Sequence, residues 1–394
     1  MEEIDTSPPS SDWTLTLHAS IHEIGPEAWD QCAGDGNPFV SFGFLSALED
    51  SGSVADGTGW LVRHAALRDP EGRIAALAPL YGKAHSWGEY VFDQSWARAY
   101  EAAGGRYYPK FVCAVPFSPV PGPRLLLRPG LPDPAATAVA LAEALVQATA
   151  QMDLSSLHAN FCDAPSLRAF EAAGYLHRTG IQYHWHNHGY CSFDDFLNAL
   201  ASRKRKAIRK ERRAAQDSGL SFVTRRGRDI SAADWEAFYR FYQSTVDRKW
   251  GSAYLTPAFF PLLSERLGDR VVLMLAEQDG RLVAGALNLM GADTLYGRNW
   301  GCEGNWPFLH FELCYYQAID FAIAHGLSRV EAGAQGEHKI QRGYLPSFTH
   351  SAHALLDPGL RRAVSGFLDE ERRAMEQEAD ALSTLSPYRR DESE

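Results

Sequence analysis

The stretch 328–347, SRVEAGAQGEHKIQRGYLPS, gathers acids, a histidine and cations around three glycines. Gly333, Gly336 and Gly343 allow tight turns or a close approach of the backbone. A carboxylate or a neutral imidazole can take a proton from an amine, and a cation can stabilise a developing oxyanion, so these residue types suit a site for both steps. The polar residues are Glu331, Gln335, Glu337, His338, Lys339 and Arg342. The alternative is a salt-linked surface loop.

A second stretch, SRKRKAIRKERR at 202–213, contains eight Lys or Arg residues and one Glu in a chain whose formal net charge is −11. Ser192 is placed to cap a helix that runs from Phe193 to about residue 215. At about 100° per residue, apolar side chains fall on one side of this helix and cations on the other. The cationic face contains Arg203, Arg205, Lys206, Arg209, Lys210, Arg212 and Arg213.

Three interpretations of this cationic face remain open. It can be a solvated surface that neutralises the surplus carboxylates, or a site for the phosphates of a donor such as tRNA or coenzyme A. A cationic amphipathic helix can also lie on anionic lipid.

Other patterns point to no further chemistry. His184, His186 and His188 would share one face of a strand, but no carboxylate or cysteine stands at a matching spacing, so we predict no metal site. The six cysteines form no CxxC pair, and the chain has no GxSxG, Walker or HExxH motif.

The bulk properties indicate packed cores and a cytoplasmic protein. Of the 394 residues, 45% are hydrophobic and 12% aromatic. The start of the chain is acidic and polar, unlike a signal peptide, and the apolar stretch 135–152 contains Glu143 and is typical of a soluble helix. We therefore expect no transmembrane segment and no permanently bound cofactor.

Two segments of the chain look alike, 60–84 and 269–293. Each predicts two strands joined by a tight turn, at Gly72 and Gly280, and a helix follows each of them, at 95–105 and 309–326. The repeat predicts two related α/β (α+β) domains, each with a mixed β-sheet flanked by helices. The expected boundaries are an N-terminal segment with a partly disordered start at 1–36, a first domain at 37–189, a second domain at 190–383 with a C-terminal helix, and a disordered tail at 384–394.

Several stretches resemble the FemAB-like branch of the GNAT superfamily of acyltransferases. They are EAGAQGEHKIQRGY, HFELCYYQAIDFAIAHG, SRKRKAIRKERR, GEYVFDQSWARAYEAAGGRYYPKF and VPFSPVPGPRLL, and the likeness runs from about residue 37 to about 370. The resemblance implies two tandem GNAT-like domains. Relatives of the Fem type move an amino acid from tRNA to an amine on a peptidoglycan precursor.

By this resemblance, the second domain would hold the reaction centre. Lys339 matches a late lysine near the acyl carbonyl in Fem-type enzymes, where its charge would stabilise the oxyanion. Candidates for the base are His310, Glu312 and His338, and Glu331 is a further catalytic candidate. Candidate substrate contacts are Arg248, Lys249, Trp250, Tyr254, Arg298, Trp300, Gln335 and Arg342, with Tyr108 and Lys110 in the first domain; Arg298 and Trp300 share a face if their strand is regular.

One departure bears on the donor. Ahead of helix 309–326, the sequence GCEGNWPF lacks the Arg/Gln-x-x-Gly-x-Gly/Ala loop that holds the pyrophosphate of acyl-coenzyme A in GNAT enzymes, and it carries Glu303 and Pro307 there. This favours an aminoacyl-tRNA donor, with phosphate contacts from Arg203, Arg205, Lys206, Arg209, Lys210 and Arg213. The sequence therefore predicts an N-acyltransferase acting on an amine-bearing small molecule or peptide, with tRNA as a partner and homo-oligomers as a further expectation. The alternatives are an acetyl-CoA-dependent N-acetyltransferase and a non-catalytic recognition protein.

Overall fold

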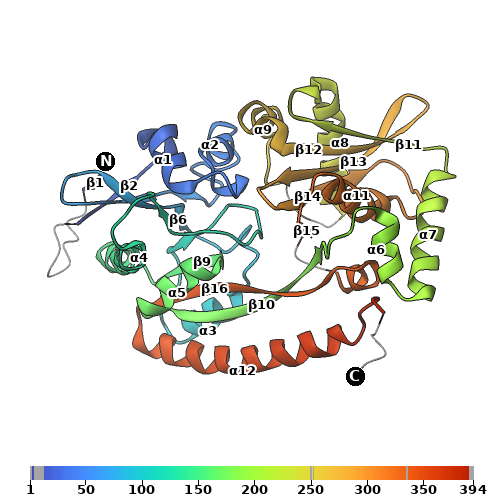
Figure 1. Cartoon of the computed structure of the whole chain (residues 1–394). Helices are drawn as coiled ribbons and strands as arrows, with labels where there is room; N and C mark the ends of the chain where they lie inside the picture. Colours follow the sequence, from blue (N-terminus) through green and yellow to red (C-terminus); the bar gives the residue numbers. More distant parts are fainter. Residues whose placement is uncertain (1, 4–12, 249–250, 252, 334–335, 390–394) are drawn as a thin grey trace. The chain divides into compact units, whose positions relative to one another are not determined.

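A computed structural model describes residues 2–3, 13–248, 251, 253–333 and 336–389, and the chain divides into two compact units (Figure 1). Unit 1 contains Met1–Gly180 and Phe348–Glu376, and unit 2 contains Ile181–Ser347 and Gln377–Glu394. The mixed α/β class predicted from the sequence is confirmed.

Unit 1 contains an antiparallel sheet in the order β1-β2-β4-β5-β8 and a second row of strands in the order β3-β6-β7-β9-β16, in which only β7 and β9 are parallel. The strands are β1 (Glu2–Glu3), β2 (Thr14–His18), β3 (Leu61–Val62), β4 (His64–Arg68), β5 (Ile74–Ala78), β6 (Leu80–Lys83), β7 (Lys110–Cys113), β8 (Leu126–Leu127), β9 (Ser156–Cys162) and β16 (Leu345–Leu355). The helices are α1 (Pro26–Ala33), α2 (Phe42–Asp50), α3 (Gln94–Ala102), α4 (Pro134–Gln151), α5 (Ala164–Ala172) and most of α12 (Pro358–Ser383), with 3₁₀ turns at Ile21–Glu23 and Pro38–Val40.

The predicted elements of unit 1 are present. Between β4 and β5, Gly72 has a φ of 78°, as the predicted tight turn requires. The stretch 135–152 forms α4, whose buried face of Leu141, Leu145 and Ala148 joins the core that also contains Leu157 of β9.

Unit 2 contains strands in the order β11-β12-β13-β14-β15-β10, in which only β14 and β15 are parallel. They are β10 (Leu176–His186), β11 (Ser221–Arg226), β12 (Val271–Gln278), β13 (Arg281–Met290), β14 (Thr294–Cys302) and β15 (Arg329–Glu331). The helices are α6 (Phe193–Ala199), α7 (Ser202–Gln216), α8 (Ala232–Arg248), α9 (Phe259–Leu267), α10 (Leu309–Phe311) and α11 (Gln317–Ala324), with a π-helical turn at Glu312–Tyr316 and 3₁₀ turns at Gly227–Asp229, Gly268–Arg270 and Glu337–Arg342.

Helices cover both faces of the unit 2 strands (Figure 1). Gly285 and Gly301 are Cα partners on β13 and β14, and a Cβ at Gly301 would lie 1.9 Å from the carbonyl oxygen of Phe241, so the glycine lets α8 approach closely. On the other face, Leu313 and Ile319 of the helix predicted at 309–326 pack with Leu295 in one core. The predicted turn at 279–280 has φ values of 50° at Asp279 and 77° at Gly280, which suit a two-residue hairpin.

The domain boundaries differ from the prediction. The division falls at Gly180 rather than near Gly189, and residues 348–376 belong to unit 1. Part of the predicted N-terminal segment belongs to unit 1 as well, because β2 pairs with β4. Strand β16 pairs with β9, about 190 residues earlier, and such distant pairings leave no local signal in the sequence.

The predicted helix 193–215 is two helices, α6 and α7. Ser192 caps α6 as predicted, because its side chain accepts a hydrogen bond from Asp195 N. The helix ends because Leu200 is extended and forms a β-bridge with Tyr388, while Ala201 N donates to Pro387 O at 2.9 Å. The tail predicted to be disordered is therefore ordered through residue 389 and interrupts the helix; residues 390–394 lie outside the described residues.

Candidate active site

The glycine-rich stretch of unit 2 forms a folded loop after β15. Gly333, Gly336 and Gly343 have φ values of 79°, 119° and 89°, as predicted from their positions among polar residues. A Cβ at Gly336 would lie 2.5 Å from Cε1 of His338, so the glycine makes room for that imidazole. His338 and Lys339 follow on the 3₁₀ turn Glu337–Arg342.

Lys339 is a buried cation held by the backbone. Its side chain is 2% exposed, and Nζ donates to the carbonyl oxygen of Gly333 at 2.8 Å. Within the described ranges no carboxylate forms an ion pair with it. Burial lowers the pKa of Lys339 to about 8, partly offset by Cys314. The ammonium is thus costly to bury and electrostatically uncompensated, which suits a group that meets negative charge during a reaction.

Aromatic and histidine side chains surround the lysine loop. His338 Nε2 and the hydroxyl of Tyr315 share a hydrogen bond of 2.9 Å. The ring of His310 lies 6.2 Å from that of His338 and 5.0 Å from that of Trp300, so three sequence-predicted residues meet here. Burial and then the charges of Arg342 and Lys339 lower the pKa of His338, which keeps the imidazole neutral and able to accept a proton near neutral pH.

Arg342 fastens this loop to α7 and is a positioning residue. Its Nη2 donates to Glu211 at 2.8 Å and its Nη1 donates to His338 O at 2.8 Å, while the guanidinium lies 3.4 Å from the ring centroid of Phe311. The predicted role of Arg342 in substrate binding is not supported, because these protein groups occupy its donors.

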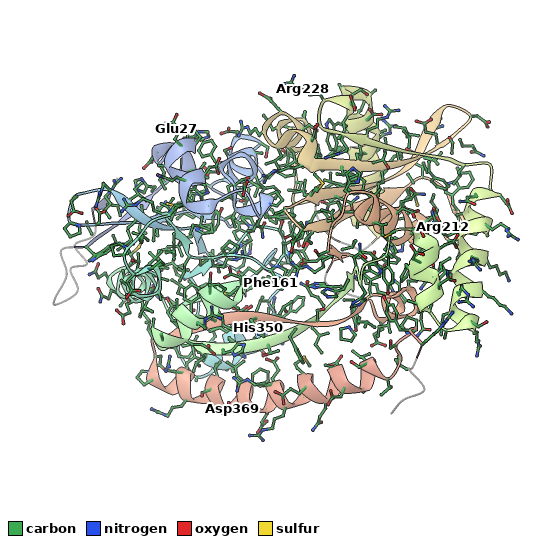
Figure 2. The ribbon with its side chains drawn as sticks, viewed as in Figure 1. Glu27, Phe161, Arg212, Arg228, His350 and Asp369 are labelled. Atoms are coloured by element: carbon green, nitrogen blue, oxygen red, sulfur yellow. The ribbon has the colours of Figure 1, made fainter. Side chains whose placement is uncertain are left out.

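Glu312 is a fully buried, ion-paired residue at the start of the π-helical turn. Its carboxylate accepts from Arg212 at 3.1 and 3.2 Å and from Gln317 at 2.7 Å (Arg212 is labelled in Figure 2). These protein donors engage both carboxylate oxygens, so the structure argues against the prediction that Glu312 is the base. Arg212 was predicted to belong to the cationic face of the helix, but it is paired with Glu312 instead.

The pairing of strands β14 and β15 is short. Their parallel pairing covers three residue pairs and ends at Tyr296 and Glu331. Glu331 is 4% exposed, and burial raises its pKa to about 7 against the lowering effect of Arg329 and Arg298. The β13–β14 register shifts opposite Arg298, so the regular alternation needed to put Arg298 and Trp300 on one face does not hold.

The outer face of α7 is cationic, as predicted. Exposed cations there are Arg203, Lys206, Arg209, Lys210 and Arg213, whereas Arg205 is half-buried. Arg209 forms an ion pair with Asp194 at 2.9 Å. The face therefore presents four exposed cations that form no ion pair within the described chain.

The remaining predicted contacts fall in unit 1, after α8, or outside the described residues. Lys110 and Tyr108 belong to unit 1, where Lys110 is completely buried against Glu89 and Asp93 and the Tyr108 hydroxyl bonds Ser86 at 2.8 Å. Tyr254 follows α8 and is half-buried, with its backbone N donating to the hydroxyl of Tyr242 at 3.1 Å. Lys249, Trp250, Gln335 and the side chain of Arg248 lie outside the described residues.

Two residues that contact the predicted ones are not among the sequence candidates. Tyr315 bonds His338, and Glu211, the one acid of the basic run, bonds Arg342. Both pairings join residues distant in sequence, so no local signal marks them. The described part of the chain contains no group of three His, Cys, Asp or Glu side chains arranged to bind a metal ion. Nor is any described helix long and apolar enough to cross a bilayer.

A family model named FemAB-like, described as peptidoglycan biosynthesis/recognition, matches residues 20–390. The chain belongs to the FemAB-like family. The family predicted from the sequence is thus confirmed. A search of curated proteins found no match.

Solved structures similar to this FemAB-like chain share its fold. The superposition with FemX covers 88% of this chain and 98% of the FemX chain, at 13% sequence identity and a TM-score of 0.52. For a conserved protein of unknown function from Bacteroides thetaiotaomicron, the superposition covers 87% of this chain and 100% of that protein, at 12% sequence identity and a TM-score of 0.50. For a tandem GNAT protein from the clavulanic acid biosynthesis pathway, the superposition covers 88% of this chain and 99% of that protein, at 12% sequence identity and a TM-score of 0.46. The likeness to FemX, over 88% of this chain, shows that the two proteins share a fold.

Proposed function

We propose that this FemAB-like protein is an N-acyltransferase of peptidoglycan biosynthesis that moves an aminoacyl group from tRNA to an amine of a precursor peptide. The observation that carries the proposal is the buried ammonium of Lys339, which has a backbone carbonyl as its hydrogen-bond partner and no carboxylate paired with it in the described ranges. The family match supports the peptidoglycan context.

The reaction needs two charge changes that this site can manage. The amine nitrogen attacks the acyl carbonyl carbon, and the carbonyl oxygen becomes an oxyanion that Lys339 stabilises. When the tetrahedral species collapses, the C–N bond remains, the C–O bond to the tRNA ribose breaks, and the ribose oxygen takes a proton. The neutral imidazole of His338, oriented by Tyr315, is placed to carry that proton.

Two features favour a tRNA donor. The outer face of α7 presents Arg203, Lys206, Lys210 and Arg213 to solvent, and arginine suits phosphate contacts. Before α10, where acyl-CoA enzymes hold pyrophosphate, the loop carries the acidic Glu303, and Pro307 has no backbone N–H to donate. This loop therefore offers few hydrogen-bond donors to a pyrophosphate.

The test is a pair of binding titrations, with bulk charged tRNA and with acetyl-CoA, at several salt concentrations. In one variant Arg203, Lys206, Lys210 and Arg213 are changed to Gln. The matched control changes four exposed arginines of unit 1, Arg98, Arg168, Arg362 and Arg373, to Gln and removes the same charge.

We expect salt-sensitive tRNA binding that the α7 variant loses and the control keeps, because each lost phosphate contact flattens the plot of log K against log salt by about 0.7 to 0.9. Acetyl-CoA binding without tRNA binding would contradict the donor and favour an N-acetyltransferase. Binding of a precursor peptide with no transfer from any charged tRNA or acetyl-CoA would favour a recognition protein.

A further inference from the structure

Glu331 is a buried carboxylate whose hydrogen-bonding capacity is unused. Its side chain is 4% exposed, and neither Oε1 nor Oε2 has a hydrogen-bond partner in the ranges the structure describes. Arg329 Nε lies 3.2 Å from Oε1, at ion-pair distance but without hydrogen-bond geometry. A carboxylate can accept about four hydrogen bonds, and leaving it unsatisfied in the interior is costly. Such a group indicates a ligand or a function at that position.

The neighbour on the adjacent strand does not fill this capacity. His184 of β10 is the Cα partner of Glu331, and its Nε2 lies 4.0 Å from Oε2. The same Nε2 lies 3.1 Å from Oε1 of Gln182, so the imidazole is engaged away from the carboxylate. Burial, and then Arg329, lowers the pKa of His184 to about 3, and the imidazole is therefore uncharged at neutral pH.

Glu331 lies close to the lysine loop. It is the last residue of β15, and Gly333, whose carbonyl holds Lys339 Nζ at 2.8 Å, comes two residues later. Two residues span at most about 7 Å of chain. The pairing of β14 with β15 also ends at Glu331. Glu331 and Gly333, whose carbonyl oxygen accepts from Lys339 Nζ, thus stand two residues apart where β15 ends.

We propose that the carboxylate of Glu331 binds the acceptor as a primary ammonium ion and takes its proton before the nitrogen attacks the acyl group. This inference rests on the proposed function and names the acceptor class and the base. An ammonium carries a positive charge and three N–H donors, and the two unused oxygens of Glu331 carry a negative charge and about four acceptor sites.

The proton transfer balances. The ammonium gives one proton to the carboxylate and becomes a neutral amine, and its lone pair then forms the C–N bond. The nitrogen loses a second proton as the C–O bond to the donor breaks, and the departing oxygen gains one proton. The proton held by Glu331 returns to solvent after the products leave.

Charged and titratable groups around Glu331 set the pH at which it works. They are Arg329 on β15, Arg298 and Tyr296 on β14, Asp293 before β14, and His184 on β10. The pKa of Glu331 is about 7 with burial as the main cause, so the base form is populated above pH 7 and lost below it.

The test compares Glu331→Gln with Glu312→Gln, a second buried glutamate of unit 2 that is fully hydrogen-bonded. Two measurements are made on the full chain: calorimetric binding of Nα-acetyl-lysine methylamide from pH 6 to 9, and kcat/KM for transfer from bulk charged tRNA to a stem pentapeptide with a free lysine amine. Thermal unfolding of both variants is recorded alongside.

For Glu331→Gln we expect loss of amine binding, a fall in kcat/KM of roughly 100-fold or more, loss of the acidic limb near pH 7, and unchanged tRNA binding. Glu312→Gln should lower the melting temperature but keep both the amine binding and the acidic limb. Amine binding and a pH profile like those of the wild type in Glu331→Gln would overturn the inference.

The two proposals fail differently. If the wild-type protein transfers nothing but binds the amine through Glu331, the inference holds and the proposed function fails. If the wild type transfers and Glu331→Gln transfers equally well, the proposed function holds and the inference fails.

Discussion

Two buried lysines, one in each unit, have opposite surroundings. In unit 1, Lys110 is completely buried, and its Nζ contacts Glu89 and Ser86 at 2.9 Å each and also Asp93. In unit 2, Lys339 is 2% exposed and donates to one backbone carbonyl. Both pay the cost of desolvation, but only Lys110 has carboxylates to offset it.

The pKa values of the two lysines reflect that difference. Burial lowers the pKa of Lys110, but Glu89 and Asp93 more than offset this, so that its pKa is raised. Burial lowers the pKa of Lys339 to about 8. A buried charge that is fully compensated stabilises a fold, whereas an uncompensated one remains available to a reacting group. Unit 1 thus uses its lysine for structure and unit 2, in our account, for chemistry.

The largest expected effect is in unit 1. Lys110→Met leaves Glu89 and Asp93 buried without their cation, and we expect the free energy of unfolding to fall by about 3–5 kcal/mol. Urea denaturation followed by circular dichroism measures it. Tyr108→Phe is the control, since it removes one hydrogen bond to Ser86 and should cost about 1 kcal/mol. A Lys110→Met protein within 1 kcal/mol of the wild type would break the comparison.

The effect of pH on stability should separate the lysines further. Because the pKa of Lys339 is about 8 in the folded chain and about 10.4 when unfolded, the unfolded state binds more protons between these values. The free energy of unfolding relative to Lys339→Met should therefore rise by up to about 3 kcal/mol from pH 8 to pH 10.4. Lys110, with a raised pKa, should show no gain over that range. Parallel curves for wild type and Lys339→Met would remove the uncompensated ammonium from the account.

A smaller effect should appear in the two buried glutamates of unit 2. Glu312→Gln weakens the hydrogen bonds that Arg212 donates to Glu312, although Arg212 still donates to Asp320 at 2.7 Å. We therefore expect the free energy of unfolding to fall by about 1–3 kcal/mol. Glu331→Gln removes a carboxylate that has no hydrogen bond to any described residue, and the free energy of unfolding should stay the same or rise. Equal losses in both variants would show that Glu331 has a structural partner.

The sequence predicted local features better than distant ones. The two hairpins, the helix at 309–326 and the positive-φ glycines around Lys339 follow from turn chemistry and periodicity, and all are present. The exchange of β16 and α12 into unit 1, and the break between α6 and α7 caused by Tyr388, depend on pairings across nearly 190 residues. Spacing alone does not reveal them.

The site was predictable in its residue types but not in its charge balance. Lys339 and His338 stood out by their position among glycines. Nothing local distinguished Glu312, which Arg212 neutralises, from Glu331, which has no hydrogen-bond partner among the described residues. The sequence also predicts that Lys110 binds substrate. Its carboxylate partners, Glu89 and Asp93, lie about 20 residues away, so no local pattern shows that this lysine is paired. Tertiary contacts determine whether a buried charge is compensated. In this account, that distinction separates a residue with a structural role from one with a role in the reaction.

The most direct test of the central claim is the rate of transfer from charged tRNA by Lys339→Met, measured together with its unfolding curve. We expect kcat to fall roughly 100- to 1,000-fold, because the oxyanion loses its cation, with a free energy of unfolding at pH 7 no lower than that of the wild type. A Lys339→Met protein that keeps its activity, or that loses activity only because it unfolds, would contradict the assignment of chemistry to this lysine.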